Sequence, residues 1–321
     1  MGTARGSAGV IERVRALLAE RLAPFGGVTA RQVLERDAPG GLEPPGLTSA
    51  NRHCRLLRAA DGWIALNLAR EEDRDLIPAL VGGEVSGDPW AAAADYASRE
   101  GAAALVSGAA ELHLPLSRLG ETGGAGFAPV VAASLAGVRV LDLSALWAGP
   151  LAAALLARAG AGVTRVQSLT RPDPTPQASP HLDAFLNGGK HRIALDFRDR
   201  KGLQTLIGEA DVVVTSGRPA ALARLGLVPT EHPHRVWLAV TAHGWRHHPD
   251  RVGFGDDCAV AGGLVRREDG EPRFLGDALA DPITGVEGAL AVLRAIASGS
   301  RGLLDVSLAG TAANYARDMD K

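Results

Sequence analysis

The chain has 321 residues, of which 46% are hydrophobic and 22% charged, a composition typical of a globular protein long enough for two cores. Its 34 basic and 36 acidic residues give a formal net charge of -2, so no overall field draws it to nucleic acid or to an anionic membrane. The sequence begins without the apolar core of a signal peptide, and no later segment offers about 18 uncharged apolar residues in a row. We therefore expect a cytoplasmic protein that binds neither nucleic acid nor membrane.

The first part of the chain, residues 1–119, is expected to form a small α+β domain with N-terminal helices. Residues 9–37 show amphipathic helical patterns, and a Pro/Gly-rich connection follows. Two short apolar runs on either side of Asp61-Gly62 predict a β-hairpin. Helical patterns continue from there, and we find no convergent set of chemical groups in this half.

A glycine-rich stretch predicts a linker over residues 120–135, after which residues 136–321 alternate strands and helices. The apolar strands are predicted at residues 138–144, 162–168, 191–197, 211–216 and 235–241. They lack polar alternation, which is typical of a parallel sheet whose two faces are both covered. The fold class expected is therefore α/β, with a mostly parallel Rossmann-like sheet covered by helices and the smaller α+β domain placed N-terminally. Such sheets bind ligands at the carboxyl ends of their strands.

The first turn from strand to helix, "LSALWAGPLAA", argues against a dinucleotide site. It contains no GxGxxG, and the bulky Trp147 stands where pyrophosphate would need bare backbone N–H groups. GxxxxGK[ST] is also missing from the sequence. We therefore expect neither hydride transfer nor phosphate-loop chemistry.

The two cysteines and nine histidines do not indicate a metal site. Cys54 and Cys258 are far apart and lack zinc-ligand spacing, and no HExxH pattern occurs. The sequence predicts buried free thiols and no metal.

The segment "GDALADPITGVEGALAVL" places Asp281 directly before Pro282 at the start of an apolar run. An Asp followed by Pro is typical of a helix N-cap. Gly285 and Gly288 would each cost the helix about 1 kcal/mol relative to Ala, so we expect another group to approach that backbone closely. These features leave two roles open for Asp281, a helix cap and a nucleophile.

Four segments in this order resemble the class III CoA-transferases, the CaiB/BaiF family that includes formyl-CoA transferase, carnitine CoA-transferase and α-methylacyl-CoA racemase. They are "VLDLSALWAGPLAAALLARAGAGVTRVQ", "NGGKHRIALDFRDRKG", "ADVVVTSGRPAALARLGL" and "DPITGVEGALAVLRAIASGSRGLLDVSL". The resemblance covers a little over half of the chain. Residues 56–68 and 109–121 also resemble the family's smaller domain, which in the family follows the α/β half. The chain therefore resembles a member with rearranged domain order.

The resemblance implies an acyl-CoA donor, a carboxylic acid acceptor and coenzyme A carried as a thioester. Asp281 occupies the position of the family nucleophile, the acid of D-x-x-TG. Such a nucleophile forms a mixed anhydride with the acyl group and then an aspartyl-CoA thioester. Asp277 is the competing candidate, although no x-x-TG follows it. The family also implies a homodimer, and we expect the active site between the two halves, near the start of the Asp281 helix.

The family pattern assigns CoA binding to Trp147, Ala148, Lys190, Arg218 and Arg224. Arg218 precedes a proline at a predicted helix start, where the helix dipole favours phosphate. A solvated surface charge is the alternative for each of the three basic residues, and a core position is the alternative for Trp147.

Several positions differ from the family pattern. The family's Glu at the end of the second strand is Gln167 here, the basic residue after it is Ser168, and Arg171 is the candidate to supply the missing charge. A catalytically silent CoA-binding or partner subunit is therefore the alternative to a CoA-transferase. A racemase is less favoured, because Asp256 stands where that activity is expected to use His.

Overall fold

The structure is a computed structural model that describes residues 4–38 and 41–319. In this part of the chain, the main sheet has six parallel strands in the order β11-β8-β7-β4-β5-β6. The strands are β4 (Arg139–Asp142), β5 (Gly162–Ser168), β6 (His191–Leu195), β7 (Val212–Ser216), β8 (Val236–Thr241) and β11 (Gly302–Ser307). Counted along this sheet, the order is 3-2-1-4-5-6, that of a doubly wound α/β fold. The predicted parallel sheet is confirmed.

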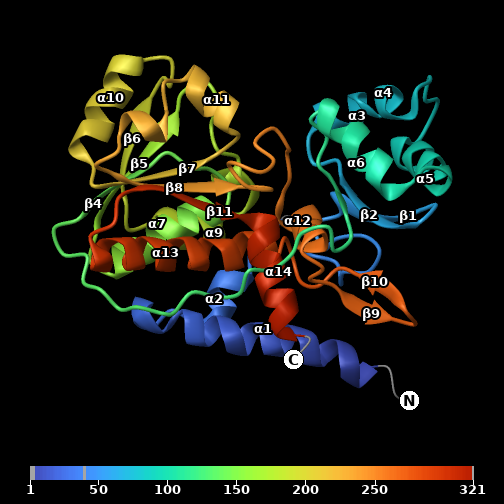
Figure 1. Cartoon of the computed structure of the whole chain (residues 1–321), viewed down its shortest axis with the longest axis horizontal. Coiled ribbons are helices and arrows are strands. Elements are labelled where there is room, and N and C mark those ends of the chain that lie inside the picture. Colours follow the sequence, from blue (N-terminus) through green and yellow to red (C-terminus); the bar gives the residue numbers. More distant parts are fainter. Residues whose placement is uncertain (1–3, 39–40, 320–321) are drawn as a thin grey trace.

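Helices cover both faces of the sheet (Figure 1). One face carries α7 (Ala148–Arg158), α9 (Pro180–Asn187) and α13 (Ala280–Ser298), and the other carries α10 (Arg200–Glu209) and α11 (Pro219–Arg224). Both faces of a central strand are buried as a result, which explains the uninterrupted valines of β7. The short elements α8 (Thr175–Ala178) and η2 (Pro229–Glu231) lie in the connections.

Helices α13 and α7 pack in close contact, as the glycines of α13 led us to expect. A Cβ atom at Gly285 would lie 2.8 Å from the Ala148 carbonyl oxygen and 2.9 Å from Leu151 Cβ. A Cβ atom at Gly288 would lie 3.1 Å from a methyl of Leu238 on β8. The glycines therefore let α13 pack tightly between α7 and the sheet.

The N-terminal elements are α1 (Ala4–Arg21), η1 (Ala23–Phe25) and α2 (Ala30–Leu34). The sequence grouped them with the small domain, whereas their buried residues Val14, Leu18 and Phe25 belong to the core under the large sheet. In Figure 1, α1 runs below α13. The guanidinium of Arg21 forms a buried bidentate ion pair with Glu287 of α13, with donor–acceptor distances of 2.7 and 2.5 Å.

The small domain has a core of its own, which includes Ile64, Leu66, Trp90 and Leu105. Its antiparallel sheet consists of β1 (Cys54–Ala59), β2 (Gly62–Asn67) and β3 (Leu116–Arg118), and its helices are α3 (Glu71–Asp75), α4 (Ile77–Val81), α5 (Pro89–Arg99) and α6 (Ala102–Glu111). Strands β1 and β2 pair as the predicted hairpin.

Helix α12 (Gly255–Ala261) lies between the two parts of the molecule (Figure 1). On its small-domain side, Val260 packs with Cys54, Leu56 and Ala65. The remaining elements are β9 (Arg266–Glu268), β10 (Glu271–Arg273) and α14 (Leu308–Met319). Among the helices of the described residues, none combines the length and the apolar character that crossing a bilayer requires.

The predicted linker contains no helix or strand and is anchored along its length. Its Thr122 N–H donates to the Ala261 carbonyl at 2.9 Å, and its Gly126 N–H donates to Asn314 Oδ1 at 2.7 Å. A Cβ atom at Gly124 would lie 2.7 Å from the Ala313 carbonyl oxygen, so this glycine allows the chain to run against α14. The domain boundaries at 119 and 136 stay a prediction.

Candidate active site

Asp281 lies in the first turn of α13, which begins at Ala280. The predicted N-cap role is wrong, because Leu279 holds the cap position. The turn starts earlier than expected because Ala278 adopts a left-handed φ of 43° and its carbonyl accepts from the Asp281 N–H at 2.8 Å. The Asp281 side chain therefore makes no bond that caps α13.

The carboxylate of Asp281 lies against the backbone at the start of α12. It accepts a hydrogen bond from the Gly255 N–H. A Cβ atom at Gly255 would lie 2.5 Å from Asp281 Oδ2 and would also collide with the Ala278 carbonyl oxygen. Only glycine therefore fits at position 255 without displacing the carboxylate.

Two further carboxylates, Asp256 and Asp277, are buried beside Asp281. Asp256 Oδ1 accepts from the Ala278 N–H at 2.9 Å, and its Oδ2 accepts from Asn51 Nδ2 at 2.8 Å. Asp277 forms an ion pair with Arg36, with Nε–Oδ2 at 2.5 Å and Nη2–Oδ1 at 2.9 Å. The Asn51 amide also reaches Asp277 Oδ1 at 3.3 Å. Among the described residues, Arg36 is the cation that forms an ion pair with this group of acids.

These surroundings favour the protonated form of the acids. Burial, followed by the charge of Asp256, raises the pKa of Asp281 to about 7, while the Arg36 charge and the Gly255 N–H act in the opposite direction. Burial, together with the charge of Asp277, raises the pKa of Asp256 to about 6. Because the charge of Asp256 raises the pKa of Asp281, the titrations of these two carboxyl groups are coupled. Perturbed carboxyl groups of this kind are typical of functional sites.

Trp147 and Ala148 are both buried at the start of α7. The guanidinium of Arg36 lies 5.4 Å from the centre of the Trp147 ring, so Trp147 and Asp281 share Arg36 as a neighbour. The indole N–H of Trp147 has no hydrogen-bond acceptor among the described residues. Trp147 belongs to the core under the sheet, as its alternative interpretation predicts.

The ammonium group of Lys190 is buried and donates three hydrogen bonds inside the protein. Its acceptors are Asp142 Oδ2 at 2.7 Å, the Pro150 carbonyl at 2.8 Å and Asn187 Oδ1 at 2.9 Å. Burial lowers the pKa of Lys190. A direct contact between this lysine and a phosphate would require breaking the bond to Asp142.

The three predicted arginines lie nearer the surface. Arg218 is partly exposed at the N-cap of α11, directly after β7, whereas Arg224 and Arg171 are exposed. Arg171 follows β5, so it shares the carboxyl edge of the sheet with Arg218. None of the hydrogen bonds or ion pairs in the described ranges links these arginines to Asp281. Their role in CoA binding stays a prediction.

Sequence reasoning missed Arg36 and Asn51. Both come from the irregular region between α2 and β1, where no motif marks them. Only the folded chain brings them to Asp256 and Asp277, more than 200 positions later. A local pattern therefore could not have identified them.

A second buried group contains His243, Asp257 and Cys258. The Cys258 Sγ lies 4.0 Å from His243 Nε2 and 3.8 Å from Asp257 Oδ2. Burial lowers the pKa of His243 to about 3 and raises that of Cys258 well above its usual value. Both cysteines are buried free thiols, as predicted. The expectation that the protein holds no metal stays a prediction.

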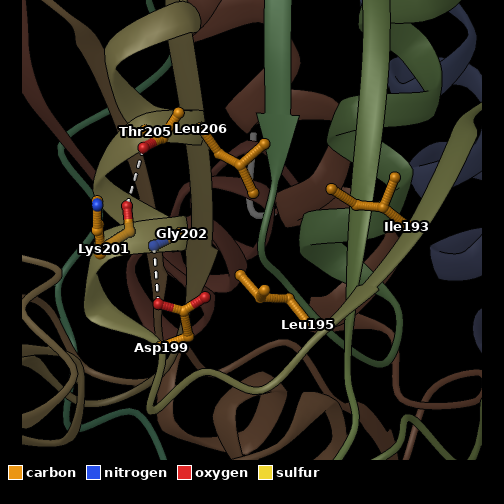
Figure 2. Close-up of a pocket in the computed structure, with 7 residues that line it drawn as sticks. All are labelled: Ile193, Leu195, Asp199, Lys201, Gly202, Thr205 and Leu206. Atoms are coloured by element: carbon orange, nitrogen blue, oxygen red, sulfur yellow. Dashed lines mark hydrogen bonds between the residues drawn. The ribbon is translucent and has the colours of Figure 1, made fainter.

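Figure 2 shows a shallow pocket of about 410 Å³ at the β6 edge of the sheet. Its lining residues are Ile193, Leu195, Asp199, Lys201, Gly202, Thr205 and Leu206. The Asp199 carboxylate in this pocket accepts from the Gly202 N–H at 2.9 Å, which caps α10. None of the predicted site residues lines it, so we place the candidate site at Asp281.

Comparison with known proteins identifies the family of the chain. Residues 135–318 match the family described as CoA-transferase family III. An acyl-CoA transferase of Fusarium pseudograminearum is 30% identical over 195 residues, which cover 52% of this chain and 42% of that protein. A succinate–glutarate CoA-transferase of Agrobacterium fabrum is 28% identical over 204 residues, which cover 54% and 50%. The chain therefore spans about half the length of the curated relatives it matches.

Solved structures show the same relationship. The crystal structure of Rv3272 from Mycobacterium tuberculosis matches with a TM-score of 0.51 and 27% identity, over 57% of this chain and 56% of that one. A CaiB/BaiF family protein from Brucella suis matches with a TM-score of 0.51 and 26% identity, over 56% and 54%. Since the family match covers more than half of its residues, the chain belongs to CoA-transferase family III.

Proposed function

We propose that the protein is an enzyme that moves CoA from an acyl-CoA thioester to a carboxylic acid, with Asp281 as the nucleophile. One observation carries the proposal: within the family match, the Asp281 carboxylate makes no bond that caps α13 and lies against the bare glycine backbone at the start of α12. A carboxylate placed in this way can meet a thioester carbonyl. The Gly255 N–H holds it in place.

The proposed reaction proceeds in four transfers. A carboxylate oxygen of Asp281 attacks the thioester carbon, the C–S bond breaks, and CoA leaves as a thiolate from the mixed anhydride. The thiolate then attacks the Asp281 carbonyl carbon, which releases the donor acid and forms an aspartyl-CoA thioester. The acceptor carboxylate attacks that thioester, its C–S bond breaks, and CoA leaves as a thiolate from a second anhydride. CoA thiolate finally attacks the acceptor acyl carbon, which yields the new acyl-CoA and regenerates Asp281.

The CoA nucleotide is proposed to lie along the carboxyl edge of the sheet. Strands β4 and β7 are neighbours whose chain connections diverge, which is where doubly wound sheets bind ligands. Arg218 follows β7, and Trp147 and Ala148 follow β4, so all three flank this point. Exposed Arg171 and Arg224 are available to nearby phosphates. Lys190 supports the same edge through its bond to the Pro150 carbonyl in α7.

The test is a search for a covalent acyl or CoA adduct by intact mass after incubation with a panel of acyl-CoAs. We expect a mass gain on the wild-type protein that Asp281→Asn abolishes. Asp95→Asn is the matched control, because that carboxylate forms an exposed ion pair with Arg99 on α5. An adduct that persists in Asp281→Asn would overturn the assignment of the nucleophile.

The second candidate is a catalytically silent CoA-binding or partner subunit. The raised pKa of Asp281 favours it, because a protonated carboxyl group is a poor nucleophile. Titration calorimetry separates the two functions: the silent protein binds CoA yet gains no mass with any acyl-CoA. Racemase chemistry is not proposed, since both oxygens of Asp256 already accept hydrogen bonds. A homodimer stays a prediction, which light scattering after gel filtration would test.

A further inference from the structure

We propose that Arg36 and Asn51 are positioning residues for Asp281 and that the charge of Arg36 favours the ionised form of the Asp281 carboxyl group. Both lie before residue 135 and therefore outside the family match. The inference rests on the proposed function, because it assigns a purpose to groups that surround the proposed nucleophile. The N-terminal part of the chain would then complete the active site.

The segment that leads into α13 has two residues with left-handed backbone conformations. Gly276 has a left-handed φ of 75°, and Ala278, a non-glycine residue, has a φ of 43°. Such a conformation at alanine costs free energy and persists only when neighbouring groups hold it. Asp256 holds this segment through the Ala278 N–H. The position of the first turn of α13, and hence of Asp281, depends on this segment.

The side chain of Asn51 binds two of the acids. Asn51 donates its two described amide bonds to Asp256 and Asp277, while its own carbonyl oxygen accepts from Ser49 Oγ at 2.8 Å and from the His53 N–H at 2.9 Å. The side chain is thus fixed at both ends. The Asn51 side chain thereby connects Asp256 on α12 with Asp277 in the segment before α13. Its removal would make both elements that contact Asp281 less well ordered.

The positive charge of Arg36 lies among three carboxyl groups. Asp256, Asp277 and Asp281 form a group of three acids, and the guanidinium of Arg36 is ion-paired with Asp277 and covered by the Trp147 ring. The Arg36 side chain is 22% exposed and the Asp277 side chain 7%, so water screens this charge poorly. Two other titratable groups, the Asp257 carboxyl with its pKa raised to about 7 by burial and the thiol of Cys54, lie near Asp256. The thiol of Cys258 lies near Asp281, and the imidazole of His53 lies near Arg36 and Asp277. Removal of Arg36 would leave the neighbouring carboxylates to repel the negative charge of Asp281.

The experiment measures the ionisation of Asp281 directly. Protein labelled with ¹³C at the aspartate side-chain carboxyl carbon is titrated by NMR, and the Asp281 signal is assigned by its loss in Asp281→Asn. We expect Arg36→Met to move the Asp281 midpoint to higher pH by about one unit, because a positive neighbour has been removed. The double variant Arg36→Met/Asp277→Asn removes both charges and should return the midpoint toward the wild-type value. Arg36→Lys keeps the charge and should titrate like the wild type.

The same variants are then compared in the rate of adduct formation between pH 5 and 9. On the acidic limb, Arg36→Met should react about tenfold more slowly than the wild type, and at pH 9 the two rates should converge. Asn51→Ala should lower the rate at every pH, because it affects position more than charge. The control is Arg31→Met, which removes an exposed guanidinium paired with Glu35 and should change neither readout.

The outcomes separate the two hypotheses. If no acyl-CoA gives an adduct on wild-type protein, the proposed function fails, whereas the NMR titration still decides whether Arg36 controls Asp281. An unchanged Asp281 midpoint in a folded Arg36→Met variant would overturn the role of Arg36. An unchanged rate in Asn51→Ala would overturn the role of Asn51.

Discussion

Asp281 illustrates a conflict between stability and chemistry at a single residue. Its folded-state pKa of about 7 lies well above the ordinary value for aspartate, so ionisation of this group is less favourable in the folded protein than in the unfolded chain. The proposed nucleophilic attack nevertheless requires the ionised form. A carboxyl group whose ionised form lowers the stability of the fold is expected at a functional site rather than at a helix cap.

Asp281→Asn should therefore stabilise the fold while abolishing exchange. The wild-type carboxyl group contributes stability that is fully present below the unfolded pKa and is lost as pH rises through about 7. The variant has no carboxyl group to ionise and keeps its stability as pH rises. Its free energy of unfolding should therefore exceed that of the wild type by little at pH 4 and by on the order of 1–3 kcal/mol at pH 8. Denaturant unfolding at the two pH values measures the difference. An advantage of the variant that is equal at pH 4 and at pH 8 would contradict the raised pKa of Asp281.

Lys190 tests whether a buried charge binds a ligand or supports the fold. With Lys190→Met, Asp142 would keep only Arg165 as a charged partner, at 3.4 Å. We expect a loss of about 3–5 kcal/mol in the free energy of unfolding, because a buried carboxylate loses its close partner. Lys201→Met on the exposed face of α10 is the control and should change stability little. Unchanged stability combined with lost CoA affinity would instead support direct binding of CoA by Lys190.

At the scale of elements, the sequence predicted the large sheet well because its central strands β7 and β8 are apolar runs bounded by turn residues, and the more polar β5 and β6 alternate with helical patterns around them. It predicted the hairpin from a single turn signal around Asp61. The placement of α1 was not predictable, since amphipathicity shows that one face is buried without naming what covers it. The beginning of α13 was misplaced because the left-handed Ala278 leaves no signature in the sequence. For the candidate site, the motif predicts Asp281, whereas Arg36 and Asn51 come near it only through long-range packing.

The α13–α7 contact should be sensitive to one methyl group. Gly285→Ala would place Cβ within 2.9 Å of Ala148 and Leu151, closer than such atoms approach in proteins. We expect a loss of about 1–3 kcal/mol in the free energy of unfolding. Adduct formation should also slow, because α13 carries Asp281. Gly108→Ala on α6 has open space around it, and differential scanning calorimetry should show a small stabilisation there.

At the scale of the whole molecule, the N-terminal segment packs on the C-terminal half of the chain. Helix α1 packs under the sheet built from the second half, and the region after α2 reaches the acids beside Asp281. The Arg21–Glu287 pair is the buried ionic contact between α1 and α13 in the described residues. Fold and site therefore both depend on contacts between the two ends of the sequence.

Arg21→Met should show how strongly α1 is bound. The substitution leaves Glu287 buried without its cation, so we expect the free energy of unfolding to fall by about 3–5 kcal/mol. Arg21→Met/Glu287→Leu removes both charges and should recover much of that loss. Arg15→Met, which breaks an exposed pair with Glu12, should have little effect in the same denaturant titration. Equal effects of the two single variants would contradict the structural role of α1.

Gly255 has a consequence for natural variation. Every substitution at this position adds at least a methyl group where Asp281 Oδ2 and the Ala278 carbonyl already lie. A gene that still encodes a working nucleophile therefore cannot accept a missense change in this codon, whereas a gene whose product only binds CoA has no such restriction. Among orthologues, glycine at 255 and aspartate at 281 should be retained together or lost together. Genome sequences can then separate lineages under selection for catalysis from those that have lost it.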